Sequence, residues 1–512
     1  MATGYLVLLW ALLVVLGWLA LRKPPKGLPP GPRPLTLLGN LLQLGKLPHR
    51  SLAELARRHG PLISLRLGLV PHIVVSSPSV AKQVLQKHDQ LLSYRAPPDA
   101  TQALDHAKLS MVMLPPGATW RSLRKICNSK IFATQRLDAN QGFRSQKVRE
   151  LVSFVEQSAR AGQPVDVGRA VFTTTLNLLS TTIFSADMVS HDEESSAEFK
   201  NLVRQVMIES ASPNLSDYFP LLRWADPQGR RRRLTFHLRN LKNIFDRKIN
   251  DRLSSRSFPA TSNPEDFLDV LLNANASLEL DRPAIDHLLV DLFCAGSDTT
   301  STTVEWAMAE LLRNPTAMEK ARREVAEVTK GLQKETVEES DIGRMPYLQA
   351  VVKETLRLHP PVPFLIPRRA VETVELSMDG EGDNSSRSYT VPAETTVLIN
   401  AWAIGRDPAT WGSDADVFLP ERFSGGGCGD VDFRGCHMEL IPFGAGRRIC
   451  PGLPLAARML HLLLANLLWS FDWKLPEGTA AGDISMTENF GIALSKAEPL
   501  LAVPVLAQKS MQ

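Results

Sequence analysis

The sequence predicts a mainly α-helical protein with small β-sheets, built as one body behind an N-terminal transmembrane helix. Three observations support this fold class. Apolar residues recur at helical spacing along most of the chain, short alternating segments are few, and an uncharged apolar run precedes a proline-rich stretch. The chain has 512 residues, 44% of them hydrophobic and 22% charged, which is an ordinary globular composition.

The first 21 residues are predicted to form a membrane anchor. The run from Tyr5 to Leu21 carries no charge and, at about 1.5 Å per residue, is close to the shortest helix that crosses a bilayer. Arg22, Lys23 and Lys26 follow directly, which predicts a single span with the rest of the chain in the cytosol. A cleaved signal peptide is the alternative, but no basic segment precedes the run and no A-x-A site follows it.

Proline is concentrated in residues 22–45, directly after the anchor. Because proline fixes φ and lacks a backbone donor, this segment is predicted to be a semi-rigid spacer, although any linker between domains would have the same composition. No internal repeat or long low-complexity tract interrupts the remainder of the chain. Residues 46–512 are therefore predicted to form one domain.

Periodicity locates the elements of this domain. Helices are predicted where apolar residues recur every three or four positions, and strands where they alternate. The predicted helices are 52–58, 80–87, 148–161, 236–254, 284–312, 316–329, 346–358 and 453–468. The predicted strands are 63–67, 72–75 and 395–399.

Charge and cysteine content exclude two classes of protein. Lys and Arg total 58 and Asp and Glu total 54, which leaves a net charge of +4. This balance argues against a nucleic-acid-binding protein, because such proteins carry a large basic surface. Five scattered cysteines do not form a disulfide framework, which favours a reducing compartment.

Cys450 is the strongest candidate for a functional residue. It lies in the segment FGAGRRICPG, residues 443–452, directly before a predicted helix. Glycine allows close approach of a flat or anionic group, while the helix N-terminus and two neighbouring arginines favour a thiolate. Its isolation from other cysteines and histidines argues against zinc, and the spacing matches neither a phosphate loop nor a dinucleotide site. A buried structural cysteine is the alternative.

The spacing F-x-x-G-x-R-x-C-x-G in this segment resembles the haem-binding signature of the cytochrome P-450 family, the haem-thiolate monooxygenases. Further motifs of the family precede this segment and occur in the family's order along the chain. They are Trp120 and Arg124 as W-x-x-x-R, AGSDTT at 295–300, Glu354 and Arg357 as E-x-x-R, and PERF at 420–423. The resemblance covers the whole chain. It implies the cytochrome P-450 fold and a haem b cofactor whose iron takes Cys450 as its axial ligand.

The resemblance also implies roles for other residues. The residues matching cofactor contacts are Cys450, Trp120, Arg124, Arg368, Arg448, Phe443 and Gly444. Thr299 and Asp298 match the catalytic pair that delivers protons during oxygen activation. A polar helix face toward solvent is the alternative for this pair, but the mostly apolar segment 288–295 before it favours a buried helix.

Glu354 and Arg357 are expected to have a structural role. Their i,i+3 spacing places them on one helix face, where they can pair. An exposed pair of little energetic importance is the alternative. The resemblance implies instead that Arg422 joins them in a buried triad behind the cysteine segment.

The chain contains no flavin or nicotinamide motif, so electrons must come from another protein. The resemblance implies an endoplasmic reticulum membrane enzyme that receives electrons from NADPH through NADPH–cytochrome P-450 reductase, with Lys125, Lys130 and Arg447 as a basic face for docking. The arginine run 230–233 is expected to be a solvated or membrane-facing surface.

The substrate is predicted to be a small apolar molecule, oxidised with O2. The residues matching substrate contacts in the family are Val112, Leu114, Leu292, Ala295, Val362, Phe364, Ile366 and Phe490, although many of them could equally be core residues. Segments such as DYFPLL at 217–222 and NAWAIGRD at 400–407 resemble plant microsomal enzymes of the geraniol 8-hydroxylase type, which implies hydroxylation of a monoterpenol.

Alternatives remain at two levels. Within the monooxygenases, the substrate could be a sesquiterpene, a diterpene, or an alkaloid or phenolic skeleton. Beyond them stand a reductase-independent haem-thiolate isomerase or dehydratase and a non-catalytic membrane haem protein. The intact haem segment and the Asp298–Thr299 pair argue against both.

Overall fold

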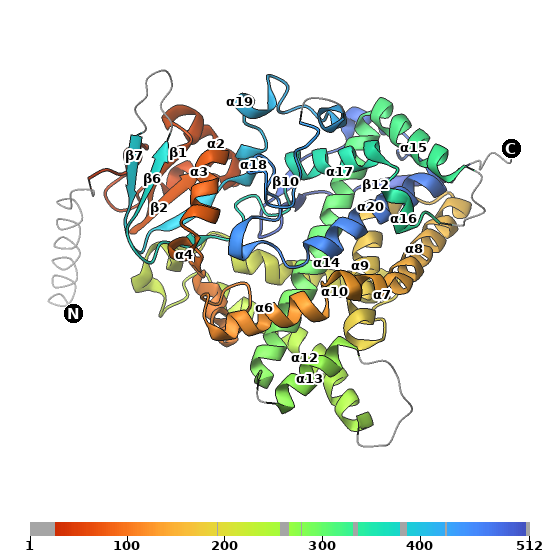
Figure 1. Ribbon diagram of the computed structural model, residues 1–512, viewed down its shortest axis with the longest axis horizontal. Helices are drawn as coiled ribbons and strands as arrows, with labels where there is room; N and C mark the ends of the chain where they lie inside the picture. Colours follow the sequence, from red (N-terminus) through yellow and green to blue (C-terminus); the bar gives the residue numbers. More distant parts are fainter. Residues whose placement is uncertain are drawn as a thin grey trace, which may run out of the picture.

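The computed structural model describes residues 26–191, 193–256, 266–277, 279–330, 336–378, 387–424 and 428–507. The predicted transmembrane anchor, residues 1–21, lies outside these residues. Helices make up most of the described chain, and the largest sheet lies at one end (Figure 1). The predicted fold class, mainly α with small β-sheets, is confirmed.

The long helices form the body of the molecule. They are α2 (Pro48–His59), α6 (Ala118–Lys130), α8 (Gln141–Ala161), α9 (Val167–Phe184), α10 (Glu193–Ala211), α12 (Arg230–Arg256), α13 (Phe267–Ala276), α14 (Arg282–Arg313), α15 (Pro315–Thr329), α17 (Pro346–Leu358) and α20 (Leu453–Ser470). The shorter α-helices are α3 (Pro78–Lys82), α4 (Asp89–Leu92), α5 (His106–Leu109), α7 (Thr134–Ala139), α11 (Leu215–Tyr218), α16 (Glu339–Ile342), α18 (Ala401–Ile404) and α19 (Pro408–Trp411).

Tight turns connect these helices. One is a π-helical turn, η2 (Gln83–Lys87). The others are 3₁₀ turns: η1 (Leu41–Gln43), η3 (Asp99–Asp105), η4 (Pro220–Leu222), η5 (Pro420–Phe423), η6 (Gly446–Arg448) and η7 (Ala481–Asp483).

Segments from both halves of the chain share the sheets. The largest sheet has the order β1 (Leu62–Leu67), β2 (Val70–Val75), β8 (Thr396–Ile399), β5 (Arg368–Arg369) and β3 (Tyr94–Arg95). The other sheets are β4 (Val165–Asp166), β12 (Leu501–Leu506) and β9 (Phe471–Lys474); the hairpin β6 (Val374–Met378) and β7 (Arg387–Val391); and β10 (Glu488–Asn489) with β11 (Ser495–Lys496). All three predicted strands are present in the five-stranded sheet, where β2 and β8 pair in parallel.

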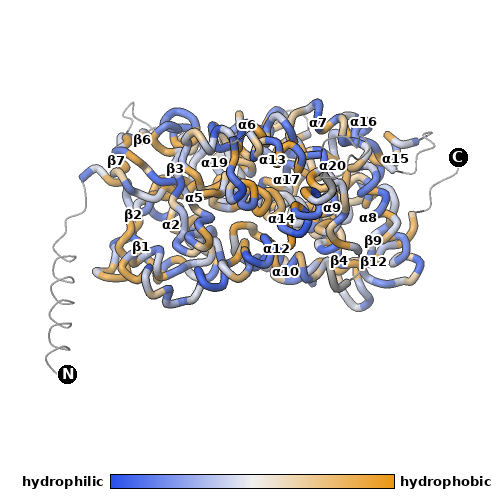
Figure 2. The backbone as a smooth tube through the Cα atoms, turned by 90° about the horizontal axis from the view of Figure 1, so that it is seen from below, coloured by the Kyte–Doolittle hydropathy of each residue, from blue (hydrophilic) through white to orange (hydrophobic). Residues whose placement is uncertain are grey.

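Helix α14 runs through the interior of the protein. Its 32 residues span about 48 Å. Asp281 caps its start by accepting a hydrogen bond from the backbone N–H of Ala284, and Pro283 occupies the first turn, where its missing N–H costs nothing. The first half packs in a core cluster with α10, α12 and α13, and the second half in a cluster with α8, α15, α17 and α20. Viewed from below, hydrophobic segments concentrate around α14 (Figure 2).

Two differences between the predicted and the observed helices have identifiable physical reasons. Helix α9 was not predicted because it is buried on nearly every side, so its sequence lacks a one-sided apolar period. Helix α12 begins six residues before its predicted start, at Arg230. Arg230 and Arg233 pair with Glu209 of α10, and Arg231 pairs with Asp99 at 2.7 Å. Three arginines of the run therefore connect α12 to α10 and η3, while Arg232 is 79% exposed and keeps the expected solvated character.

The described part of the predicted spacer, residues 26–45, contacts the sheet. The backbone carbonyl of Pro30 accepts a hydrogen bond from the N–H of Ser64 at 2.9 Å, and Asn40 hydrogen-bonds to the backbone of Arg66. Gly39 and Leu67 form an isolated β-bridge. Proline composition indicated stiffness but could not show that this segment packs along β1.

Among the described residues, one helix, α20, is long and apolar enough to cross a bilayer. It packs against α8, α14, α15 and α17, and its residues from Met459 to Leu468 are buried. We therefore interpret α20 as a core helix of the domain.

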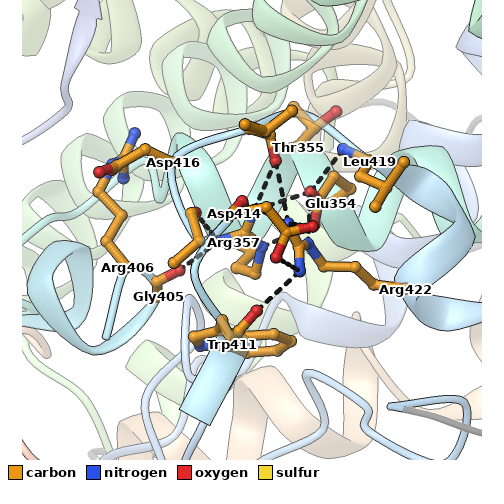
Figure 3. Close-up of polar contacts among 12 residues, drawn as sticks. Glu354, Thr355, Arg357, Gly405, Arg406, Trp411, Asp414, Asp416, Leu419 and Arg422 are labelled. Carbon is orange, nitrogen blue, oxygen red and sulfur yellow. Dashed lines mark hydrogen bonds and ion pairs between the residues drawn. The ribbon is translucent and has the colours of Figure 1, made fainter. Parts of the chain in front are cut away.

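A buried ionic cluster joins α17 to the segment before the cysteine loop (Figure 3). Glu354 and Arg357 form two hydrogen bonds of 2.7 and 2.6 Å, and both side chains are completely buried. Arg422 reaches the same carboxylate at 3.3 Å and also hydrogen-bonds to Asp414. Arg357 donates further hydrogen bonds to backbone carbonyls, including that of Gly405. The structure thus brings together the three residues of the expected triad.

Replacing Glu354 by alanine is expected to lower the free energy of unfolding by about 3–5 kcal/mol, because Arg357 would remain buried without its counter-ion. Urea denaturation followed by circular dichroism measures this change. Arg323→Ala is the control, because Arg323 forms an exposed i,i+4 pair with Glu319 whose loss has little effect. Equal effects of the two substitutions would contradict the structural role of the cluster.

Candidate active site

A cavity of about 300 Å³ extends along α14 toward the segment that carries Cys450. Helices α6, α9, α10 and α20, the segments 106–113 and 361–368, and the segment 442–452 also line it. Apolar side chains predominate in the lining, with a few polar groups at defined positions. This is the usual composition of a small-molecule or cofactor site.

The cysteine segment is a loop whose glycine spacing has a structural cause. Gly444 and Gly446 have φ values of +69° and +68°, in the left-handed region that favours glycine. A Cβ on Gly446 would lie 2.0 Å from the backbone oxygen of Leu85, so no other residue fits there. The loop is closed by a 3.0 Å hydrogen bond from the N–H of Cys450 to the carbonyl of Phe443.

The environment of Cys450 is suited to a thiolate that has a positive partner. Burial raises the pKa of the thiol, whereas the backbone N–H groups of Gly452 and Leu453 and the charge of Arg124 lower it. The polar groups around the sulfur therefore favour the thiolate, while its desolvation opposes the isolated charge. A metal cation bound to the sulfur would remove this penalty.

Four arginines line the same cavity: Arg95, Arg124, Arg368 and Arg448. They donate hydrogen bonds to backbone carbonyls, for example from Arg95 to Ile366 at 2.8 Å and from Arg448 to Ser93 at 2.9 Å. Burial and mutual repulsion lower the pKa of Arg95 well below its usual value and that of Arg448 to about 10. No carboxylate lies within ion-pair distance of these four guanidinium groups in the described ranges of the chain.

These features fit a haem. The cavity offers the thiol of Cys450 with N–H groups directed at it, apolar walls and a cluster of cations that lack an anionic partner. A haem has an iron ion, a flat apolar ring and two carboxylate side chains. The Nη1 atom of Arg448 is buried and has no hydrogen-bond partner among the described residues, as expected if a propionate binds there. All seven residues expected to bind the cofactor line this cavity.

Arg95 is a cavity residue that the sequence analysis missed. It lies on the two-residue strand β3, which pairs with Arg368 and Arg369 of β5, and this pairing brings it to the cavity. Its only signal in the sequence was the pair Tyr94–Arg95 before a proline-containing turn, which matches no motif.

Thr299 and Asp298 face different sides of α14, because adjacent helical residues point about 100° apart. Thr299 lines the main cavity, and its hydroxyl donates a 2.7 Å hydrogen bond to the carbonyl of Ala295. Asp298 lies in a separate small polar cavity with Lys200 and Arg204 of α10. Burial raises the pKa of Asp298, and these two cations lower it.

Five of the eight residues expected to contact substrate line the cavity: Val112, Leu292, Ala295, Val362 and Ile366. Leu114, Phe364 and Phe490 are not among the lining residues. The side chain of Leu114 packs in a core cluster, and its carbonyl accepts a hydrogen bond from Arg448. Phe364 and Phe490 pack around His49.

Replacing Arg95 by leucine is expected to weaken haem retention, because one of the cations facing the propionates would be lost along with its bonds to two wall segments. The fraction of haem transferred to apomyoglobin over time measures retention. Arg369→Leu is the control, since Arg369 is adjacent in the sheet but pairs with the exposed Glu394. Unchanged haem transfer from the Arg95 variant would contradict this interpretation.

Replacing Cys450 by serine is expected to abolish the long-wavelength Soret band of the reduced, carbon-monoxide-bound protein, because a hydroxyl is a far weaker ligand than a thiolate. Cys436→Ser is the control, since Cys436 is exposed and lies outside the cavity lining. A thiolate spectrum from the Cys450 variant would show that another residue binds the iron.

Comparison with known proteins agrees with this site. The cytochrome P-450 family pattern matches residues 29–503. Geraniol 8-hydroxylase from Catharanthus roseus is 50% identical over 504 residues, covering 98% of this chain and 99% of the relative. The geraniol 8-hydroxylase of Swertia mussotii is 50% identical over 481 residues, 93% of each chain. Drimenol monooxygenase from Persicaria hydropiper is 47% identical over 480 residues, 93% of this chain and 92% of the relative. The thiol segment, the arginine cluster and these similarities lead to one conclusion: the chain belongs to the cytochrome P-450 family of haem-thiolate monooxygenases.

Proposed function

We propose that this protein is a membrane-anchored monooxygenase that hydroxylates a C–H bond of a small terpenoid, in particular a monoterpenol such as geraniol. The main observation is the single cavity in which Cys450, the arginine cluster, Thr299 and apolar walls lie together. Relatives at 47–50% identity act, by their names, on geraniol and drimenol. Both compounds are terpene alcohols.

The first task of the protein is to hold the haem, which supplies oxygen activation at its iron when bound. Cys450 would bind the iron, with the N–H groups of Gly452 and Leu453 directed at its sulfur. Arg95, Arg368 and Arg448 would bind the propionates. Trp120 would support this site, because the guanidinium of Arg448 lies 4.5 Å from the centre of its ring.

The second task is proton delivery into a largely apolar cavity. The hydroxyl of Thr299 can donate a hydrogen bond into the cavity after rotating away from the carbonyl of Ala295. Asp298, which faces a different side of α14, is positioned to take up protons where Lys200 and Arg204 lie. Side-chain rotation and water would carry protons from Asp298 to Thr299. Helix α14 would thereby separate the proton source, Asp298, from the substrate.

The third task is to hold the substrate and exclude bulk water. Leu292, Ala295, Val362 and Ile366 supply apolar wall area without a competing charge. An apolar skeleton gains binding energy there in proportion to the surface it buries. Shape and apolar contact alone provide limited discrimination between positions on a flexible chain.

Electrons would come from NADPH through a membrane-bound reductase. Lys125 and Lys130 are exposed on α6, the helix that also carries Arg124 and Trp120 into the cavity. Arg447 is half-exposed and pairs with Asp89 at 2.7 Å. These three cations would attract an acidic partner to the surface nearest the thiol. We further propose residues 1–21 as the anchor in the endoplasmic reticulum membrane, with the domain in the cytosol.

Replacing Thr299 by alanine is expected to lower the yield of hydroxylated geraniol per NADPH consumed by about tenfold or more, because proton delivery contributes factors of about 10²–10⁴. Product formation and NADPH oxidation are measured with the membrane fraction and reductase. Thr303→Ala is the control. The Thr303 hydroxyl makes a similar bond to a carbonyl one turn back, that of Thr299, but it lies outside the cavity lining.

An unchanged product yield per NADPH in the Thr299 variant would contradict the proposed proton delivery. Product formation by the wild type without reductase would favour an isomerase or dehydratase instead.

A further inference from the structure

We propose that His106 and Asp291 form a hydroxyl-binding pole in the cavity, which binds an alcohol at one end of the substrate and directs oxidation to the other end. This inference rests on the proposed function and refines it: the preferred substrate is an apolar skeleton with a hydroxyl at one terminus.

Both residues line the cavity, and they approach it from different elements. His106 is the first residue of α5, and Asp291 lies in the first half of α14. The Nε2 atom of His106 is 3.7 Å from Oδ1 of Asp291. This separation is too long for a direct hydrogen bond, but a hydroxyl oxygen to one side, at about 2.8 Å from each atom, could bond to both.

The imidazole of His106 is held by its other nitrogen. Its Nδ1 atom lies 2.8 Å from Nδ1 of His287 on α14. Leu104 and Asp105, directly before His106, have φ values of +51° and +57°, a conformation that non-glycine residues adopt only where the surroundings enforce it. In the described part of the chain, Nε2 of His106 has no partner within hydrogen-bonding distance. The ring is thus oriented with one nitrogen available to a ligand.

The carboxyl group of Asp291 is oriented by its neighbours. Its two oxygens lie 2.8 and 2.9 Å from the hydroxyl of Ser110, and the backbone N–H groups of Met111 and Val112 also donate to it. These bonds tie α14 to the loop that follows α5. The pole is therefore preorganised, and binding a substrate there would cost little conformational entropy.

A neutral hydroxyl suits this pole better than a cation. Burial and the nearby His287 lower the pKa of His106 to about 3, so the ring is neutral. Burial raises the pKa of Asp291 to about 7, so this carboxyl group carries only part of a charge near neutrality. A hydroxyl both donates and accepts, and it can bond to a neutral imidazole and a carboxyl group whichever of them carries the proton.

The position of the pole explains regiochemistry. Asp291 and Thr299 are eight residues apart on α14, which corresponds to about 12 Å along the axis. Leu292 and Ala295 supply apolar wall between them. A terpenol bound by its hydroxyl at the pole would extend along this wall and place its opposite terminus beside Thr299, toward Cys450.

The test compares geraniol with the hydrocarbon in which hydrogen replaces the hydroxyl. Dissociation constants are measured from the spin-state shift of the haem spectrum, for wild type, His106→Phe and His106→Gln. His72→Phe is the matched control, since His72 is buried in β2 and outside the cavity lining. The carbon-monoxide spectrum of each variant verifies that its haem site is intact.

The wild type is expected to bind the alcohol about tenfold more tightly than the hydrocarbon, as for one hydrogen bond to a buried polar pair. His106→Phe is expected to reduce this ratio to nearly one, with little change for the hydrocarbon, and to spread oxidation of geraniol over several positions. His106→Gln keeps a donor and an acceptor, so it should retain most of the preference, and His72→Phe all of it.

An unchanged ratio in His106→Phe with an intact haem spectrum would overturn the inference. So would tighter binding of the corresponding primary amine, which would mark Asp291 as a cation site. If the wild type binds the alcohol and the hydrocarbon equally tightly, the hydroxyl-binding role of His106 and Asp291 is contradicted, but the proposed function is not. Failure of the wild type to bind or oxidise either compound would overturn the proposed function itself, and the inference with it.

Discussion

The cavity depends on buried positive charge that no carboxylate of the described segments neutralises through an ion pair. Arg95, Arg124, Arg368 and Arg448 each donate hydrogen bonds to backbone carbonyls of the surrounding loops, so the cations connect the walls. Their burial is costly without an anion. A group with two carboxylates offsets that cost, so cofactor binding and the stability of the walls are coupled. The four arginines therefore form the binding site for the carboxylates and also destabilise the cavity when no carboxylate is bound.

Helix α14 separates two chemical environments. Thr299 and the apolar wall face the main cavity, whereas Asp298 faces Lys200 and Arg204. This division follows from helical geometry, because adjacent residues point about 100° apart. Thr299 can therefore receive protons from the side of Asp298 without opening the substrate side to solvent. Asp291, one of the few polar groups on the substrate side, is oriented by Ser110 and by backbone N–H groups.

The ionic cluster of Glu354, Arg357 and Arg422 directs the course of the chain around it. Glu354 and Arg357 are fully buried, and the desolvation of both charges offsets much of their attraction. Their bonds reach Gly405, Leu419 and Arg422, which belong to segments without long helices of their own. Apolar packing could not place these irregular segments as accurately, because it lacks direction.

The sequence by itself determined the features that depend on local spacing. The cysteine segment, the E-x-x-R pair and the position of α14 are recognisable because glycine conformation, i,i+3 pairing and helix capping act within a few residues. Arg95 could not be found in this way, since pairing between β3 and β5 brings it to the cavity. Phe364 and Phe490 were expected to face substrate, but they pack around His49, because residues from distant segments compete for the same apolar space. Only the tertiary structure decided which apolar residues form walls and that His106 lies opposite Asp291, since those contacts join segments more than 180 residues apart.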